Sequence, residues 1–133
     1  MGRRLRWGGV VLACLLVPTG CGSGQDGAAA SAAVDLASAV GDQRGADACR
    51  LLAPAARAEL EDSSGKPCAE AVLEEDLGSA TSPVDVQVFD TMARVRLAED
   101  TVFLSRFDGT WLVIAAACTP RGERPYDCGI QAS

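Results

Sequence analysis

The 133-residue sequence contains no histidine. Nucleophile pairs of the serine–histidine and cysteine–histidine kind are therefore excluded, because both need an imidazole as general base. The chain also lacks a Gly-x-Ser-x-Gly nucleophile elbow, a Gly-x-x-x-x-Gly-Lys-Ser/Thr phosphate loop and an Asp-x-Asp-x-Asp-Gly calcium loop. We therefore expect a protein that is not an enzyme and that holds no cofactor and no metal ion.

Positive charge is scarce beyond residue 20, where nine basic residues accompany all eighteen acidic residues of the chain. The net charge of that part is therefore −9, and no basic stripe interrupts it. Such a surface repels nucleic acids and anionic lipid headgroups, so we expect no nucleic-acid partner. The acidic clusters at 59–62 and 70–76 are interpreted as solvated faces of helices.

Apolar runs are also short, and the longest lies near the start of the chain. Three arginines (Arg3, Arg4 and Arg6) precede an apolar stretch of eleven residues, 7–17. A permanent membrane span needs about 20 residues, so this stretch is too short for one. We interpret residues 1–20 as a secretory signal peptide. The Arg3-Arg4 pair is also compatible with twin-arginine export.

The segment Pro18-Thr19-Gly20-Cys21 resembles a bacterial lipobox. That resemblance implies that Cys21 receives a diacylglycerol and becomes the new N-terminus. The residues after it, up to 27, are rich in glycine and polar, so we interpret residues 21–27 as the lipidated cysteine and a flexible tether. The partner would then be a lipid membrane, and the domain would lie on the extracellular face of the cell membrane. Cys14 is a poorer candidate because the apolar run before it is very short. Ordinary cleavage near Gly20, which would give a free secreted protein, is the alternative.

Four cysteines remain downstream, at positions 49, 68, 118 and 128. An even number in an exported domain predicts two disulfides, for which three connectivities exist. We favour Cys49–Cys68 and Cys118–Cys128, because each pair closes a short loop and would stabilise the fold by about 3 kcal/mol. A zinc site is the rival interpretation, and the absence of histidine and of any Cys-x-x-Cys pair disfavours it.

Residues 28–133 are expected to form a single domain that begins with helices over 28–77. An i, i+3, i+4, i+7 stripe precedes a natural stop at Gly41, and Pro54 and Pro67 suit the starts of later helices. The expected segments after the first helix are 46–52, 55–61 and one that begins at Pro67. Residues 78–83 are interpreted as a linker.

The periodicity changes to two after the linker, which predicts strands at 84–88, 93–97, 101–107 and 110–118. A turn at Asp90-Thr91 would place Asp85 opposite Arg96, and Asp108-Gly109 is a strong hairpin signal. Residues 119–128 are interpreted as a loop. The predicted fold class is α+β, with N-terminal short helices packed on one face of a four-stranded antiparallel meander and two disulfides. The residues expected to face the helices are Val84, Val86, Val88, Ala93, Val95, Leu97, Val102, Leu104, Val113 and Ala115.

The stretches DACRLLAPAARAELE, SGKPCAEAVLEEDL and DTVFLSRFDGTWLVIAAACTPRGERPYDC, together with the lipobox, resemble small exported lipoproteins of high-GC Gram-positive bacteria. This resemblance implies a place in the cell envelope and no particular chemistry. The order of helices followed by a curved sheet is also similar to the nuclear transport factor 2-like (cystatin-like) cone fold. Proteins of that fold sometimes place a catalytic aspartate between helix and sheet. The candidate catalytic residues here would be the carboxylates of Asp90 and Asp100 and the phenol of Tyr126.

The face of the predicted sheet that points away from the helices is unusually apolar. We interpret it as a docking surface for a partner or a second copy; partial cover by the tail, or a register error of one residue, are the alternatives. A non-enzymatic binding module is therefore the leading hypothesis, ahead of a purely structural envelope protein and of a cone-fold enzyme. The residues of this possible interaction surface are Phe89, Met92, Phe103, Phe107, Leu112 and Ile114.

Overall fold

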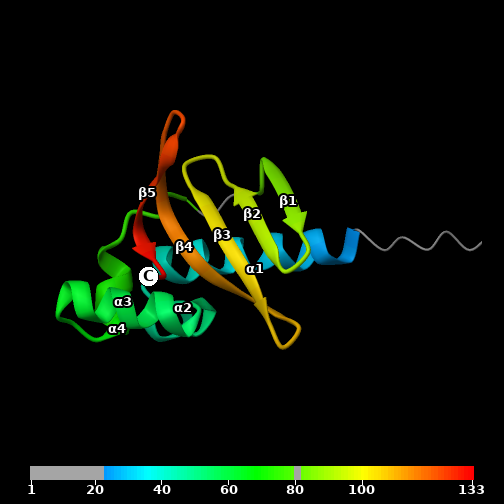
Figure 1. The fold of residues 1–133 in the computed structure, drawn as a ribbon. Helices are drawn as coiled ribbons and strands as arrows, with labels where there is room; N and C mark the ends of the chain where they lie inside the picture. The colour runs from blue at the N-terminus through cyan, green and yellow to red at the C-terminus, as the bar shows by residue number, and fades with distance from the viewer. Residues whose placement is uncertain (1–22, 80–81) are drawn as a thin grey trace, which may run out of the picture.

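The computed structural model describes residues 23–79 and 82–133 (Figure 1). The predicted signal peptide at 1–20 and the predicted lipidation at Cys21 lie outside the described residues. The elements are α1 (Ser23–Gly41), α2 (Gly45–Leu51), α3 (Pro54–Ser64), α4 (Cys68–Ala71), the 3₁₀ helix η1 (Val72–Glu74), β1 (Asp85–Phe89), β2 (Met92–Arg96), β3 (Thr101–Phe107), β4 (Thr110–Arg121) and β5 (Arg124–Gln131).

Helix α1 is longer than predicted, because it begins at Ser23 and not at residue 28. Residues 23–27, which we expected to be part of a flexible tether, are therefore helical. The carboxamide of Gln25 accepts a hydrogen bond from the indole Nε1 of Trp111 at 3.2 Å, and Ala29 is fully buried one turn later. These contacts hold the first turns of α1 against β4.

The three following helices are short, and a disulfide joins α2 to α4. Cys49 of α2 is bonded to Cys68 of α4 with a Cα–Cα distance of 6.1 Å, which confirms the predicted pairing. Pro54 occupies the first position of α3, where its missing N–H has no helical partner to lose. Gly65 ends α3 in the left-handed conformation, with φ of 66°.

The sheet has five antiparallel strands in the order β1-β2-β3-β4-β5, so the predicted strand count of four is wrong. Residues 119–128 form a hairpin between β4 and β5, not the predicted loop. Pro120 lies at a register irregularity beyond the part of β4 that pairs with β3, and Pro125 lies on an edge strand. Proline is tolerated at both kinds of position because no ladder hydrogen bond is lost there. Cys118 and Cys128 face each other across this hairpin and form the second predicted disulfide.

The predicted register of the first hairpin is confirmed, since Asp85 pairs with Arg96 and Gln87 pairs with Arg94. The Asp108-Gly109 turn is confirmed as well. Both of its residues have positive φ, 48° and 82°, as a type I′ turn requires. Charge pairing and alternation were therefore sufficient to predict the register in this part of the sheet.

A β-bulge changes which residues of β4 face the helices. Val113 pairs with Leu104 but Ala115 pairs with Phe103, so Ile114 is the extra residue. Because directly opposed residues share a face, Ala115 lies on the same face as Phe103, and Ala116 takes the core position with no exposed surface. The prediction that Ala115 faces the helices is therefore wrong. Val84 is also outside the core, because it precedes β1 and is 60% exposed.

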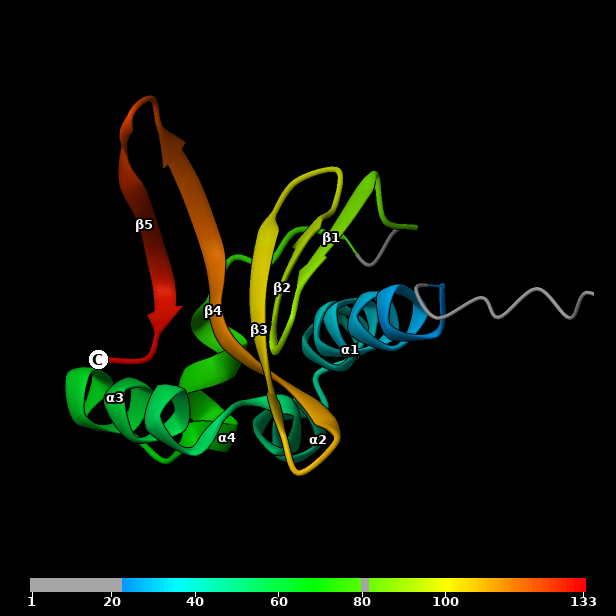
Figure 2. The same ribbon diagram turned by 45° about the vertical axis from the view of Figure 1, so that its right-hand side comes forward.

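The remaining predicted core residues are confirmed. Val86 and Val88 are half-buried against the core, and Trp111 joins it as a residue that the pattern did not identify. Figure 2 shows α1 crossing one side of the sheet and α2–α4 gathered at its lower end, so no described helix covers the opposite face. The fully confirmed strand positions are Ala93, Val95, Leu97, Val102, Leu104 and Val113.

Candidate functional site

The face of the sheet opposite α1, here called the outer face, carries the predicted interaction surface. The observed registers place Phe89, Met92, Phe103, Phe107 and Leu112 there. Ile114, the extra residue of the bulge, lines the same hollow as Phe103. A register error of one residue, one of the alternatives, occurs only in β4 beyond Val113. Phe89, Met92 and Phe107 are exposed, at 63%, 43% and 42%. The other three, Phe103, Leu112 and Ile114, are half-buried.

Strand β5, which the sequence did not predict, explains why Phe103 is less exposed than Phe89 and Phe107. The ring of Tyr126 packs edge-on against Phe103, with centroids 5.1 Å apart and an interplanar angle of 72°. Partial cover by the tail, one of the alternatives, is therefore realised on the β4–β5 side of the outer face. The β1–β2 side keeps its exposed aromatic residues.

Two hollows meet at Phe103. One, about 340 Å³ in volume, is lined mainly by apolar residues of β4 and β5, among them Ile114, Ala115 and Tyr126. The other, about 250 Å³, lies over β1 and β2 and is lined by Phe89, Met92 and Arg94 among others. We call the first the tyrosine hollow and the second the arginine hollow. Their shared wall makes Phe103 the centre of the site.

One row of residues connects the two hollows across the whole sheet. The pairs in adjacent strands are Gln87 with Arg94, Arg94 with Phe103, Phe103 with Ala115, and Ala115 with Gln131. The small Ala115 side chain leaves space at the fourth position, and the β4 bulge is what places alanine there. The sequence did not predict this row. The run from Ile114 to Ala117 is apolar throughout, so alternation does not indicate which of its residues face the core.

Arg94 supplies the positive charge of the row. Its Nη2 donates to Gln87 Oε1 at 2.8 Å, and Asp85 Oδ2 lies 3.7 Å from the same nitrogen. That second distance is too long for a good hydrogen bond, and both side chains are about one-third exposed, so the ion pair is weak. Within residues 23–79 and 82–133, the Nε of Arg94 is buried and has no hydrogen-bond partner.

The three candidate catalytic residues are not brought together. Asp90 lies in the β1–β2 turn and Asp100 precedes β3, so they lie at opposite ends of β2, while Tyr126 packs on Phe103. Asp100 is 6% exposed, and its carboxylate accepts backbone hydrogen bonds from Thr101, Ala117 and Cys118. Burial raises the pKa of Asp100, although these three bonds act in the opposite direction. The carboxylate is thus engaged in fixing the β3–β4 junction.

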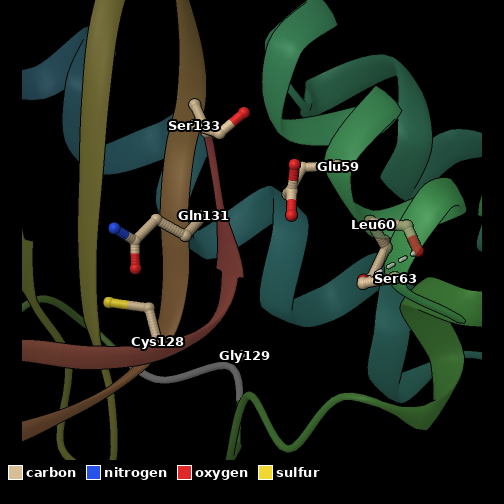
Figure 3. Close-up of a pocket in the computed structure, with 8 residues that line it drawn as sticks. Glu59, Leu60, Ser63, Cys128, Gly129, Gln131 and Ser133 are labelled. Atoms are coloured by element: carbon tan, nitrogen blue, oxygen red, sulfur yellow. Dashed lines mark hydrogen bonds between the residues drawn. The ribbon is translucent and has the colours of Figure 1, made fainter.

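A third hollow, of about 330 Å³, lies between α3 and the end of β5 (Figure 3). Glu59 and Ser63 line it from the helix, and Gln131 and Ser133 line it from the opposite side. The Ser63 hydroxyl donates to the carbonyl of Leu60 in its own helix at 3.3 Å, and no base contacts it among the described hydrogen bonds. This hollow can bind polar groups, but it offers no activated nucleophile.

The acidic cluster at 70–76 divides into separate contacts. Glu74 pairs with Lys66, and burial raises the pKa of Glu75, with a smaller contribution from Glu74. No group of three or more carboxylate or cysteine side chains in the described part of the chain is arranged to hold a metal ion. We therefore place the candidate site on the outer face and not in this cluster.

No protein-family model, curated protein or solved structure matches the chain. The resemblances to exported lipoproteins and to the cone fold consequently stay predictions. Among residues 23–79 and 82–133, none of the helices combines the length and the apolarity needed to cross a bilayer. The interpretation of the site rests on its geometry.

Proposed function

We propose that the protein is a lipid-anchored module of the cell envelope that binds a partner or ligand through the outer face without catalysis. The observation that carries this proposal is the exposure of Phe89, Met92 and Phe107 on one sheet face that no described helix covers. Large side chains of this kind on a solvent face cost solubility, and clustered exposed apolar residues are typical of interaction sites.

The chemistry of the fold supports binding over turnover. The chain has no histidine, and the one strongly buried carboxylate among the candidates, Asp100, already accepts three backbone hydrogen bonds. A general base must reach the proton that it removes, and this carboxylate is occupied. The outer face, by contrast, offers hollows, aromatic rings and the guanidinium of Arg94.

The start of α1 sets the length of the proposed anchor. Only Gly22 separates Cys21 from the first helical residue, Ser23, so about 7 Å of chain joins the acylated residue to the helix. The domain would therefore lie close to the bilayer surface, without the flexible tether that the sequence predicted. Two or three acyl chains would hold it there much longer than one.

Replacement of Cys21 by alanine tests the anchor. We expect the variant to leave the membrane fraction or to remain unprocessed, because no other residue is predicted to carry lipid. Fractionation of cells followed by intact-mass measurement of the product distinguishes these results. Cys14→Ala is the matched control and should fractionate like the wild type. A Cys21→Ala protein that stays fully processed and membrane-bound contradicts the proposed anchor.

Photo-crosslinking in whole cells tests the binding role. A photoreactive phenylalanine analogue at Phe89 or Phe107 should give discrete crosslinked species, because these side chains are exposed on the proposed docking face. The same analogue at Ala58, an exposed position of α3, is the control and should give none of them. If neither outer-face position crosslinks above the Ala58 control, the outer face has no partner and the proposal fails.

A further inference from the structure

We propose that the outer face binds a single-chain anionic amphiphile, with its carboxylate on Arg94 in the arginine hollow and its apolar chain in the tyrosine hollow. This inference rests on the proposed function, because it names the chemistry of the ligand for the same face. Three observations support it: an arginine with only a weak ion pair, an apolar path of the right shape, and the scarcity of positive charge elsewhere along that path.

The weakly paired arginine is Arg94, whose side chain lines the arginine hollow and is about one-third exposed. Its Nε is buried and has no acceptor among the described residues, so the hydrogen bonding of this guanidinium is incomplete. Gln87 occupies part of the Nη2 end, and Asp85 is too distant at 3.7 Å to saturate the guanidinium. Because the Nε is buried, a ligand carboxylate would accept from the terminal nitrogens of this one-third-exposed guanidinium, as charge-assisted hydrogen bonds.

The apolar path starts at the neighbour of Arg94. Phe103 is directly opposite Arg94 in the adjacent strand and forms a wall of both hollows. From there the row continues over Ala115 to Gln131, between Tyr126 and Ile114. The distance from β2 to β5 is three strand spacings, or about 14 Å. An extended chain fits this path better than a compact ring does.

The sizes and charges also favour a small anionic ligand. Volumes of about 340 and 250 Å³ together fall within the ~300–1,000 Å³ range of small-molecule sites. The net charge of −9 beyond residue 20 repels anions in general, and a nearby cation offsets that repulsion locally. On the path between the hollows, that cation is Arg94, with Asp85 as its weak present partner.

The test uses the full chain carrying Cys21→Ala, purified without detergent, and dodecanoate below its micelle concentration as the probe. Binding is followed by the ¹H–¹⁵N signal of Arg94 Nε and by the backbone amide of Phe103. We expect saturable shifts of both signals. Dodecanol, which lacks the charge, should shift Phe103 but bind more weakly.

Three substitutions separate the carboxylate contact from general effects on the fold. Arg94→Gln should weaken dodecanoate binding by about tenfold or more, the value of a charged hydrogen bond of ~1.5–3 kcal/mol, and should leave dodecanol binding unchanged. Arg96→Gln, on the same strand and face two residues away, is the matched control and should change neither. Asp85→Asn should tighten dodecanoate binding, because it removes the competing carboxylate.

A fourth substitution tests the path of the chain. Ala115→Leu should fill the tyrosine hollow and weaken both dodecanoate and dodecanol without removing any charge. The inference is overturned if dodecanoate does not bind, if Arg94→Gln and Arg96→Gln act alike, or if Ala115→Leu has no effect. Crosslinks from Phe89 or Phe107 that persist when dodecanoate fails to bind would leave the proposed function standing, with a protein as the partner.

Discussion

Replacing Asp100 with alanine is expected to destabilise the fold by about 3 kcal/mol or more. Its carboxylate accepts backbone hydrogen bonds from Thr101 at 2.7 Å, Ala117 at 3.0 Å and Cys118 at 2.8 Å. Thr101 and Cys118 are almost fully buried, so water reaches their amides poorly once the acceptor is gone. Each buried donor left without a partner costs about 1–3 kcal/mol.

Chemical denaturation under non-reducing conditions measures this loss, and hydrogen exchange locates it. The amides of Ala117 and Cys118 should lose protection more than the rest of β4 does. Asp62→Ala is the matched control, because Asp62 is exposed on α3, where alanine favours the helix; its effect should stay within about 0.5 kcal/mol. A loss below 1 kcal/mol for Asp100→Ala would mean that this carboxylate does not fix the β3–β4 junction.

Asp100 should also make the free energy of unfolding depend on pH. Burial raises the pKa of Asp100 above its usual value of 3.8, so the folded state holds this proton more tightly than the unfolded chain does. The stabilising contribution of its protonation is therefore fully present below 3.8 and is lost as pH rises through the folded pKa. Denaturation at several pH values, with Asp100→Asn as the non-titrating reference, should show the wild type gaining stability relative to the variant as pH falls. The reverse slope would contradict the raised pKa.

The role of Asp100 illustrates what the sequence did not reveal. Two of its three partners lie 17 and 18 residues away, and the contact depends on Ala117 adopting a φ of 54°, which is uncommon for alanine. Local patterns describe neighbours along a strand and across a tight turn. They predicted Asp85 opposite Arg96 because charge, alternation and turn length all agreed there.

The missing fifth strand has a similar cause. Residues 119–128 contain two prolines, a glycine and several charges, which are local signals for a loop. The structure accepts them in a hairpin because β4 extends past β3 there and because the disulfide between Cys118 and Cys128 joins its two strands. The local propensity of residues 119–128 does favour a loop, but tertiary contacts that pair β4 with β5 outweigh it.

The candidate site was predictable in its composition but not in its shape. Alternation placed Phe89, Phe103 and Phe107 on one face, and the structure confirms that placement. The hollow over Ala115 depends on a bulge within a run of apolar residues, where either parity is consistent with the pattern. The unpartnered Arg94 Nε depends on side-chain geometry and has no signature in the sequence.

Replacing Gly45 with alanine is the second change expected to have a large effect. A Cβ atom on Gly45 would lie 2.0 Å from the backbone oxygen of Ala69, a separation that no non-bonded contact allows. Ala69 follows Cys68, whose disulfide to Cys49 ties α4 to α2, so the two helices cannot simply move apart. Overpacking of this kind costs about 1–3 kcal/mol and more where the neighbour is backbone, which outweighs the ~1 kcal/mol by which alanine favours a helix.

The helix-favouring gain and the steric cost can be separated with variants of this chain. Gly27→Ala, in α1 with open space around the new methyl group, should stabilise the protein by up to about 1 kcal/mol. Gly45→Ala should destabilise it by about 3 kcal/mol or more. Removing the Cys49–Cys68 disulfide by a double substitution to serine should reduce that cost, because α2 and α4 can then separate. The cycle compares the denaturant midpoints of the wild type, Gly45→Ala, the double serine variant and the protein that combines all three substitutions. If the two effects on stability are additive, the disulfide does not hold the two helices at this distance.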